Sequence, residues 1–457
     1  MRNATPSDDE LAVSLGVLRD HSVRFRPVIV AALGNDELAL LQGLFERLSI
    51  RGHDNLSQYE GRVVVRALAP IPLPHQFQSE PKRANATAPR PGTPAARALE
   101  KVAAVSGYRR GRAVQGNGSD GKLSANEIPF GPPPAVRAAL RATSESLNRY
   151  PEEDLVLEQL AKYLDVDVER VLLTNGSDEL CYLLARLLLD DSPNVIANRR
   201  QGFTVVGDPC YQIDATASIL AGAPIVKVPL DGGAHDLSAM ARAAGDGATL
   251  VWLPSPHNPT GVSVAPEDLV TFLDKVPGDC LVVLDEAYGG FTRHGDPDAS
   301  LKIGESRPNL LVQRTFSKDW GLAGLRVGYA VGDAALIGAL RRARPPFSVN
   351  SMALAAVSAV LGCSDWRAST VTMITEERTL LESTLQELGI TYFPSEANFV
   401  TCAVSFPDLR DALTSEGLSV RDGGDLGLPG WTRITVGWAP QMAALRNVLR
   451  HHLVSKG

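Results

Sequence analysis

Hydrophobic residues in the middle of the chain gather into short continuous runs, separated by longer stretches in which they recur with helical spacing. The runs lie at 171–174, 204–209, 250–253, 281–284 and 310–312. Short apolar runs without alternation are typical of strands that are buried on both faces. Because strand and helix patterns alternate from Leu155 onward, we predict an α/β fold with a mainly parallel sheet and helices on both faces.

The pattern becomes less strand-rich after residue 333. A helix is predicted at 334–344 and a long helical region at about 350–388. Further strands are predicted at 393–401, 418–421 and 433–436, and further helices at 407–413 and 440–452. These elements predict a smaller C-terminal α/β domain, which the long helical region joins to the large one.

The beginning of the chain carries no recognisable chemistry. Helical patterns at 9–18 and 35–48 and strand patterns at 23–33 and 61–68 indicate a small packing or contact unit, and the proline-rich stretch 70–94 is typical of a linker. We therefore divide the chain into five parts. They are an N-terminal extension (1–76), a linker or arm (77–114), an arm of the main unit (115–150), a large domain (151–345) and a small domain (346–457).

Composition limits the class of protein. The chain has 457 residues, of which 44% are hydrophobic and 21% charged, as in soluble globular proteins of two or three domains. A formal net charge of -7 gives no reason to expect nucleic acid as a partner. The apolar run 352–363 is too short to span a membrane, and acidic residues at 8–10 are unlike a secretory signal, so we expect a cytoplasmic protein without membrane contact.

The cysteines and histidines do not form a metal-site pattern. The five cysteines are dispersed without a CxxC pair, which is typical of free thiols in the cytoplasm. The eight histidines do not cluster in the sequence. We therefore expect neither structural disulfides nor a metal site.

Lys318 is the strongest candidate for covalent chemistry. It follows the apolar run 310–312 and lies in a stretch of small residues, with Ser317 before it and Arg326 after it. A lysine in a crowded pocket tends to lose its proton and become nucleophilic. A hydroxyl and a guanidinium are suited to a phosphate, so this set matches the chemistry of pyridoxal 5'-phosphate (PLP).

Polar side chains follow the neighbouring strands at the same edge of the predicted sheet. Asn258 follows one strand, Asp285 with Tyr288 the next, and Lys318 a third. Ligands of open parallel sheets bind at this edge. The strand at 171–174 runs into Asn175, Gly176, Ser177 and Asp178 before a leucine-rich helix, which is an arrangement that can hold an anion at a helix N-terminus.

The motif set resembles that of fold-type I PLP enzymes, in particular the histidinol-phosphate aminotransferase group of the class I/II aminotransferases. The motifs are Ser-Ala-Asn-Glu-x-Pro-Phe-Gly-Pro, Arg-Tyr-Pro, Asn-Gly-Ser-Asp-Glu, Pro-x-Tyr, His-Asn-Pro-Thr-Gly, Asp-Glu-Ala-Tyr, Phe-Ser-Lys with Leu-Ala-Gly-Leu-Arg, Ser-Glu-Ala-Asn-Phe-Val, Val-Arg-Asp and Thr-Arg-Ile-Thr-Val-Gly. The likeness covers about residues 115–457 and implies a PLP-dependent transferase with a role in amino-acid biosynthesis.

The resemblance implies a role for each matching residue. Lys318 would hold PLP as an aldimine and later move protons, Asp285 would pair with the ring nitrogen, and Asn258 and Tyr288 would bond the ring oxygen. Tyr211 would stack on the ring. The phosphate would be held by the remaining cofactor residues, which are Gly176, Ser177, Asp178, Ser317 and Arg326.

The substrate residues and the assembly also follow from the resemblance. Arg433 would bind the substrate's anionic group, Asn398 would orient it, and Arg421 would contact a distal phosphate. Asn126 and Tyr150 complete the substrate set, and Tyr150 would reach into the site of a neighbouring subunit, since such enzymes are homodimers. The expected small-molecule partners are an amino donor and a keto-acid acceptor, used in turn in a ping-pong cycle.

Three segments depart from the family pattern and leave alternatives open for the substrate and the reaction. They are the first 97 residues, the stretch 192–202, and the bulky, acidic 319–321 after the lysine. A close alternative to an aminotransferase of phosphorylated amino acids or amino alcohols is another fold-type I enzyme of specialised biosynthesis. Its reaction would be decarboxylation, or elimination or replacement on a substrate such as S-adenosylmethionine. A transcription regulator is disfavoured, because residues 1–97 hold 12 Lys/Arg and 10 Asp/Glu and lack a basic recognition helix.

Overall fold

The computed structural model describes residues 92–105, 107, 121–189, 202–293 and 296–454. Contacts divide the chain into two units, Met1–Pro89 and Arg90–Gly457, and the description below concerns the second. The expected N-terminal extension and most of the stretch 192–202 lie outside the described residues. The described chain opens with helix α4 (Pro94–Lys101), where the Thr93 side chain accepts a hydrogen bond from the backbone N–H of Ala96.

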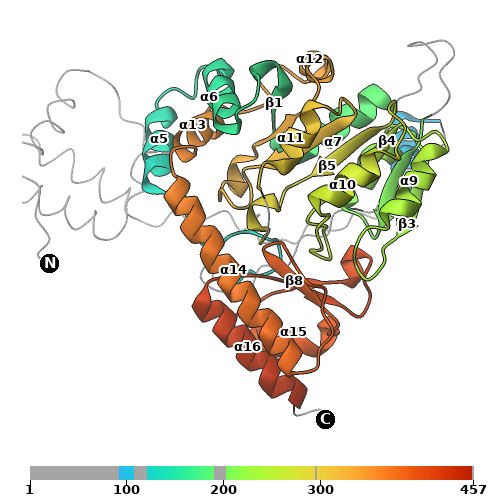
Figure 1. The fold of residues 1–457 in the computed structure, drawn as a ribbon. Helices are drawn as coiled ribbons and strands as arrows, with labels where there is room; N and C mark the ends of the chain where they lie inside the picture. Colours follow the sequence, from blue (N-terminus) through green and yellow to red (C-terminus); the bar gives the residue numbers. More distant parts are fainter. Residues whose placement is uncertain (1–91, 106, 108–120, 190–201, 294–295, 455–457) are drawn as a thin grey trace, which may run out of the picture. The chain divides into compact units, whose positions relative to one another are not determined.

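A seven-stranded sheet forms the centre of the large domain, in the order β1-β7-β6-β5-β4-β2-β3 (Figure 1). The strands are β1 (Val171–Thr174), β2 (Thr204–Asp208), β3 (Ile225–Pro229), β4 (Leu250–Pro254), β5 (Leu281–Asp285), β6 (Leu310–Thr315) and β7 (Gly328–Val331). Strands β2 to β6 pair in parallel, whereas β7 is antiparallel to both of its neighbours. The predicted mainly parallel sheet is confirmed. Strands β3 and β7 were not predicted.

Successive residues of each strand pack into two different hydrophobic cores, one on each face of the sheet. In β4, Val251 and Leu253 face the first core and Leu250 and Trp252 face the second. The first core is covered by α5 (Pro134–Ser144), α6 (Asp154–Leu164), α9 (Leu237–Gly245), α10 (Pro266–Leu273), α11 (Ala299–Glu305) and α13 (Ser351–Val360). The second is covered by α7 (Gly176–Leu188), α8 (Gln212–Leu220) and α12 (Ala334–Ala343). The predicted burial of the sheet on both faces is confirmed.

The small domain is a three-stranded antiparallel sheet in the order β8-β10-β9, packed against helices. Its elements are α14 (Ser364–Glu387), β8 (Phe399–Cys402), α15 (Phe406–Ser415), β9 (Arg421–Asp422), β10 (Thr432–Thr435) and α16 (Ala439–Val454). Helix α14 leads from α13 to this sheet and lies beside α16 (Figure 1).

Three predicted elements of the small domain differ from the structure. The strand expected at 418–421 begins only at its last residue, Arg421, and ends at Asp422. The helical region expected at 350–388 is two helices, because the backbone leaves the helical conformation at Cys363, directly after Gly362. The strand expected at 393–401 begins only at Phe399. The hydroxyl of Ser395 donates to the carbonyl of Phe399 and accepts from the backbone N–H of Ala397, and this local turn takes the place of sheet pairing.

Candidate active site

Three neighbouring strands, β4, β5 and β6, bring their carboxyl ends to one edge of the sheet, as the sequence predicted. A cavity of about 640 Å³ lies at this edge, between the large-domain sheet and the strands β9 and β10 of the small domain. Twelve of the predicted site residues line it: Asn126, Ser177, Asp178, Tyr211, Asn258, Asp285, Tyr288, Ser317, Lys318, Arg326, Arg421 and Arg433. Residues far apart in the sequence are thus gathered around one space.

Several polar groups converge on the hydroxyl of Tyr288. The side-chain amides of Asn126 and Asn258 donate to it over 2.9 Å and 3.4 Å. The amide of Asn126 is itself held by the hydroxyl of Thr435, which donates to its Oδ1 over 3.1 Å. The Nζ of Lys318 lies 5.4 Å from the centre of the Tyr288 ring. An anionic oxygen of a ligand at this point would find two amide donors, a hydroxyl and an ammonium group.

A cradle for a phosphate lies at the N-terminus of α7. The first backbone N–H groups of this helix, including those of Ser177 and Asp178, point toward the helix end. Gly176 has φ +73°, and a Cβ at this position would lie 2.6 Å from the NH2 of Arg326. The NH1 of Arg326 lies 3.4 Å from the hydroxyl of Ser317. Only glycine lets the guanidinium approach this closely, and the donor set fits the phosphate of PLP.

Asp285, the last residue of β5, is buried beneath the cavity. Its Oδ1 accepts a hydrogen bond from the backbone N–H of Ala287 over 2.9 Å. Burial nevertheless raises the pKa of Asp285 to about 6, because the ionised carboxylate is poorly solvated there. A cation beside it would restore the ionised form, so this carboxylate fits the protonated ring nitrogen of PLP.

The phenol of Tyr211 forms a wall of the cavity. Tyr211 precedes α8 and donates its hydroxyl to Oδ1 of Asp178 over 3.1 Å. Burial first, and the nearby carboxylate of Asp178 second, raise the pKa of the phenol, so it stays neutral and remains a donor. The other oxygen of Asp178 lies 3.4 Å from Arg326, which links this wall to the phosphate cradle.

Arg421 and Arg433 face each other in the small-domain sheet. They are direct cross-strand partners on β9 and β10, both are buried, and both line the cavity. The NH1 of Arg433 donates to the side-chain oxygen of Asn258 over 2.7 Å. The NH2 of Arg421 lies 3.8 Å from a carboxylate oxygen of Asp425. Two buried guanidinium groups at one end of the cavity favour an anionic ligand there.

Three predicted site residues do not line the cavity. Gly176 lies behind it, against Arg326. Asn398 is buried and donates its amide to the backbone carbonyl of Asn126 over 3.1 Å, so within this chain it supports another site residue. Tyr150 is exposed and stacks on Phe347 with a centroid separation of 4.5 Å. The single chain does not bring Tyr150 to the site.

Some residues of the cavity wall were missed by the sequence reasoning. Ala104, Val105 and Gly107, from the segment assigned to the linker, line the cavity. So does Asp425, beside Arg421. Small apolar residues and a loop carboxylate carry no local signal, and only the tertiary fold brings them to the site.

All five cysteines are free, as expected from their spacing. Within the described ranges, no three His, Cys, Asp or Glu residues gather as metal ligands. Among the described helices, none combines the length and the apolar content that a membrane span requires.

Comparison with known proteins assigns the chain to a family. Residues 121–451 match the model of aminotransferase class I and II. Histidinol-phosphate aminotransferase of Symbiobacterium thermophilum is 40% identical over 324 residues, which are 70% of this chain and 87% of that protein. The enzyme of the same name from Halalkalibacterium halodurans is 35% identical over 343 residues, which are 73% of this chain and 90% of that protein.

The fold agrees with a solved member of the same group. The crystal structure of histidinol-phosphate aminotransferase from Sinorhizobium meliloti in complex with pyridoxal-5'-phosphate matches with a TM-score of 0.64 and 27% identity, covering 74% of this chain and 92% of that one. The fold of this chain, its phosphate cradle at α7 and its buried Asp285 fit the same assignment. The chain therefore belongs to the class I and II aminotransferases, which are PLP-dependent transferases of fold type I.

Proposed function

We propose that this aminotransferase acts on an amino acid or amino alcohol that carries a phosphate, as histidinol phosphate does, with Lys318 as the cofactor lysine. The observation that carries the proposal is the pairing of Arg421 with Arg433. Like charges directly opposite each other in a sheet are unfavourable, and a strongly anionic substrate would offset that repulsion. The names of the relatives at 40% and 35% identity support the same substrate class.

The cavity residues divide into those that hold the cofactor and those that hold the substrate. PLP, when bound, supplies a ring that accepts electrons from the substrate's α-carbon. Asp285 would hold the ring nitrogen in its protonated form, and the hydroxyl of Tyr288, held by the amides of Asn126 and Asn258, would bond the ring oxygen. The N-terminus of α7, with Ser317 and Arg326, binds the cofactor phosphate.

Lys318 is the group that moves protons. It lies three residues after the end of β6, and its Nζ reaches into the cavity near Tyr288. With PLP and substrate bound, the ε-amino group of Lys318 would take a proton from the substrate's α-carbon and return it within the same half-reaction. Arg433 holds the substrate close to it, and Arg421 selects a second anionic group. The amino group passes from the donor in one half-reaction to a keto-acid acceptor in the next.

We also propose that two copies of the chain form a homodimer in the cytoplasm. A surface cleft of about 550 Å³ is lined by the exposed apolar side chains of Leu147, Tyr150, Pro346 and Phe347 and by the half-buried Met352. Exposed apolar surface of this kind is typical of contact sites. In the dimer, Tyr150, which does not line the cavity of its own chain, would complete the partner's substrate site.

A single-turnover experiment tests the proposed reaction. The enzyme with bound PLP is mixed with histidinol phosphate, histidinol, and two or three unphosphorylated amino acids, and visible absorbance is followed without an acceptor. Loss of the cofactor's visible band, fastest with the phosphorylated donor and reversed by a keto acid, is the expected result. Release of CO2, or of a group from the substrate, with the cofactor band restored in each cycle would contradict transamination and favour the alternative reactions.

A further inference from the structure

The turn that begins at Lys318 is held from outside the cavity. The backbone carbonyl of Lys318 accepts a hydrogen bond from the N–H of Gly321 over 2.9 Å. Lys318, Asp319, Trp320 and Gly321 therefore form a β-turn, with Asp319 and Trp320 at its two central positions. The positions of these two side chains set the course of the backbone that leaves Lys318.

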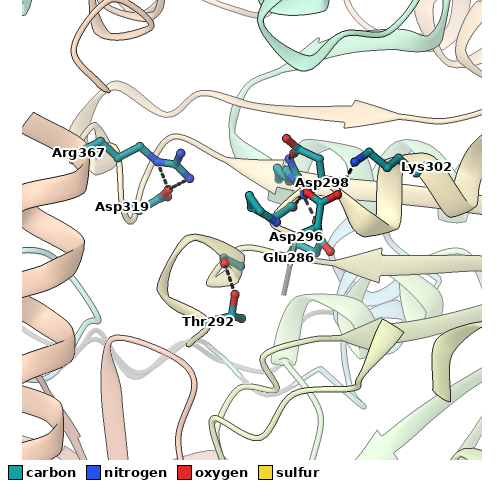
Figure 2. Close-up of polar contacts among 10 residues, drawn as sticks. Glu286, Thr292, Asp296, Asp298, Lys302, Asp319 and Arg367 are labelled. Atoms are coloured by element: carbon teal, nitrogen blue, oxygen red, sulfur yellow. Dashed lines mark hydrogen bonds and ion pairs between the residues drawn. The ribbon is translucent and has the colours of Figure 1, made fainter. Parts of the chain in front are cut away.

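Arg367, in the first turns of α14, contacts both central residues of that turn, and Figure 2 shows its ion pair with Asp319. Its Nε and NH2 lie 2.7 Å and 2.6 Å from Oδ2 of Asp319. Its guanidinium lies 4.5 Å from the centre of the Trp320 ring. Burial by itself lowers the pKa of Arg367, but the attraction and hydrogen bond of Asp319 outweigh it and raise that pKa. The side chain of Asp319 is only 7% exposed and that of Arg367 is 27% exposed, so the ion pair is partly desolvated.

The carboxylate of Asp319 also touches the segment that follows Tyr288. A Cβ at Gly290 would lie 2.2 Å from Oδ2 of Asp319, so the glycine allows a contact that no other residue permits. Asp319, Trp320 and Arg367 line a small cavity of about 110 Å³. Thr315, at the end of β6, lines both this cavity and the active-site cavity. Thr315 thus separates the cavity beside the Asp319–Arg367 ion pair from the active-site cavity.

Helix α14 carries this contact to the small domain. Farther along the helix, Leu381 and Leu385 are buried in the core of the small domain. Strands β9 and β10 of that domain present Arg421 and Arg433 to the cavity. A displacement of the small domain relative to the large one would therefore reach the Lys318 turn through α14 and Arg367.

We propose that Arg367 is a positioning residue that, through Asp319 and Trp320, ties the orientation of Lys318 to the placement of the small domain. The proposal rests on the proposed role of Lys318 as the cofactor lysine. This role also explains why the turn carries the acidic Asp319 and the bulky Trp320 instead of small residues. Asp319 supplies the carboxylate and Trp320 the ring that Arg367 binds, and neither side chain lines the active-site cavity.

The test compares four variants of the full chain with bound PLP: Arg367→Ala, Arg367→Lys, Asp319→Asn and the double change Arg367→Ala with Asp319→Asn. Arg446→Ala is the matched control, because it removes an ion pair of similar length, 2.6 Å, to Glu377 on the same helix. Three quantities are measured: the induced circular dichroism of the visible cofactor band, kcat with KM, and Tm. The first reports how the lysine-bound cofactor is oriented and does not depend on turnover.

The expected result is a changed circular dichroism of the cofactor band in Arg367→Ala and Asp319→Asn, with kcat lowered about 10- to 100-fold and KM changed far less. The double variant should be no worse than Arg367→Ala, since the pair acts as one unit. Arg367→Lys should fall between, because an ammonium keeps the charge but loses the planar fork and the stacking on Trp320. Arg446→Ala should lower Tm alone.

Two outcomes separate the proposal from the function on which it rests. If borohydride reduction attaches the cofactor to Lys318 but the Arg367 and Asp319 variants lose only Tm, like Arg446→Ala, the positioning role is wrong and the proposed function stands. If reduction does not label Lys318, the proposed function itself fails. Should Arg367→Ala not fold, Arg367→Lys and Asp319→Asn decide the matter by the same readouts.

Discussion

At the scale of single residues, the site includes side chains on strained backbone. Asn126 and Arg326 have φ of 54° and 52°, in the left-handed region that residues other than glycine rarely adopt. Each such residue costs of order 1–3 kcal/mol and persists only where its surroundings fix it. Asn126 is fixed by Thr435 and Tyr288, and Arg326 by Ser317 and Asp178. These conformations place the amide of Asn126 against the hydroxyl of Tyr288 and the guanidinium of Arg326 beside Ser317 and Asp178.

The two arginines of the small domain give the first prediction. Truncating a buried, charge-assisted contact costs roughly 2–5 kcal/mol, so Arg433→Ala should lower kcat/KM by a factor on the order of 30 to several thousand for any anionic donor. Arg421→Ala should do so only for donors with a second anionic group. Steady-state kinetics on phosphorylated and unphosphorylated donors measure both effects. If Arg421→Ala leaves the ratio of the two activities unchanged, the phosphate-substrate proposal is wrong.

A buried histidine gives a prediction on pH. Burial lowers the pKa of His235 to about 4, even though its Nε2 lies 3.0 Å from the carbonyl of Pro254. In the unfolded state His235 binds a proton near pH 6.5, whereas in the folded state it binds one only near pH 4. The free energy of unfolding therefore falls as the pH decreases from about 6.5 to about 4. At pH 5 this amounts to about 2 kcal/mol.

The measurement is the urea-unfolding free energy at pH 7.5 and pH 5 for the native protein and for His235→Gln. Burial raises the pKa of Asp285 to about 6 and also raises that of Asp214, and these groups act in the opposite direction. These carboxyl groups act equally in both proteins. Burial and, second, the neighbouring His235 lower the pKa of His257, so the difference reports His235 together with its effect on His257. The native protein should lose about 2 kcal/mol more than the variant between the two pH values. An equal loss would show that His235 does not titrate as described.

At the scale of elements, the N-terminus of α7 gives a prediction on the affinity for PLP. Gly176→Ala forces a Cβ to 2.6 Å from Arg326 on backbone with φ +73°, so the guanidinium must leave the cradle. We expect a weaker affinity for PLP, by at least tenfold, from the loss of about 1.5–3 kcal/mol of charge-assisted bonding. Cofactor fluorescence titration of the apoenzyme measures it.

Gly245→Ala is the control for that substitution. Gly245 is the last residue of α9, and a Cβ there would meet nothing within 4 Å. Alanine in this helix should leave PLP affinity unchanged and stabilise the protein by roughly 0.5–1 kcal/mol. Equal affinities of the two variants for PLP would contradict the role of the cradle.

The elements also show what the sequence could and could not predict. Strands β4, β5 and β6 were predictable because each is a continuous apolar run, and Asn258, Asp285 and Lys318 were predictable because they follow those runs. Strand β7 was missed because Gly328–Val331 is short and directly follows the small-residue stretch after Lys318. Strand β3 was missed because it is an edge strand with mostly exposed or half-buried residues.

The finer geometry of the site depends on long-range pairing that no local pattern encodes. The register that sets Arg421 opposite Arg433 joins strands separated by a loop, and Asp425 lies in that loop. The contact between Arg367 and Asp319 joins residues 48 positions apart. Such contacts follow from the placement of α14 and of the small-domain sheet. That placement is known only from the structure.

At the scale of the whole molecule, the proposed dimer gives a further prediction. The native protein should sediment as a dimer at micromolar concentration, because Tyr150 and Phe347 present exposed apolar rings, 78% and 54% accessible, beside the cleft. Tyr150→Glu should dissociate the dimer and lower activity together. Leu380→Glu, at another exposed apolar position on α14, is the control and should remain dimeric. A fully active native monomer would rule out a shared site.

The active-site cavity lies between the large and the small domain, and residues of both domains line it. The large domain supplies the cofactor residues, the small domain supplies Arg421 and Arg433, and α14 joins the two beside the Lys318 turn. Every role assigned above depends on Lys318 being the residue to which the cofactor is attached. That attachment is therefore the claim to test most directly.

Borohydride reduction of the enzyme with bound PLP, followed by peptide mass analysis, makes that test. We expect a single stable pyridoxyl adduct on Lys318 in the native enzyme and no adduct in Lys318→Ala. That variant should still bind PLP weakly through the cradle at α7, but its turnover should be lower by several orders of magnitude. An adduct on another lysine, no adduct in the native enzyme, or undiminished turnover in Lys318→Ala would contradict the role of Lys318.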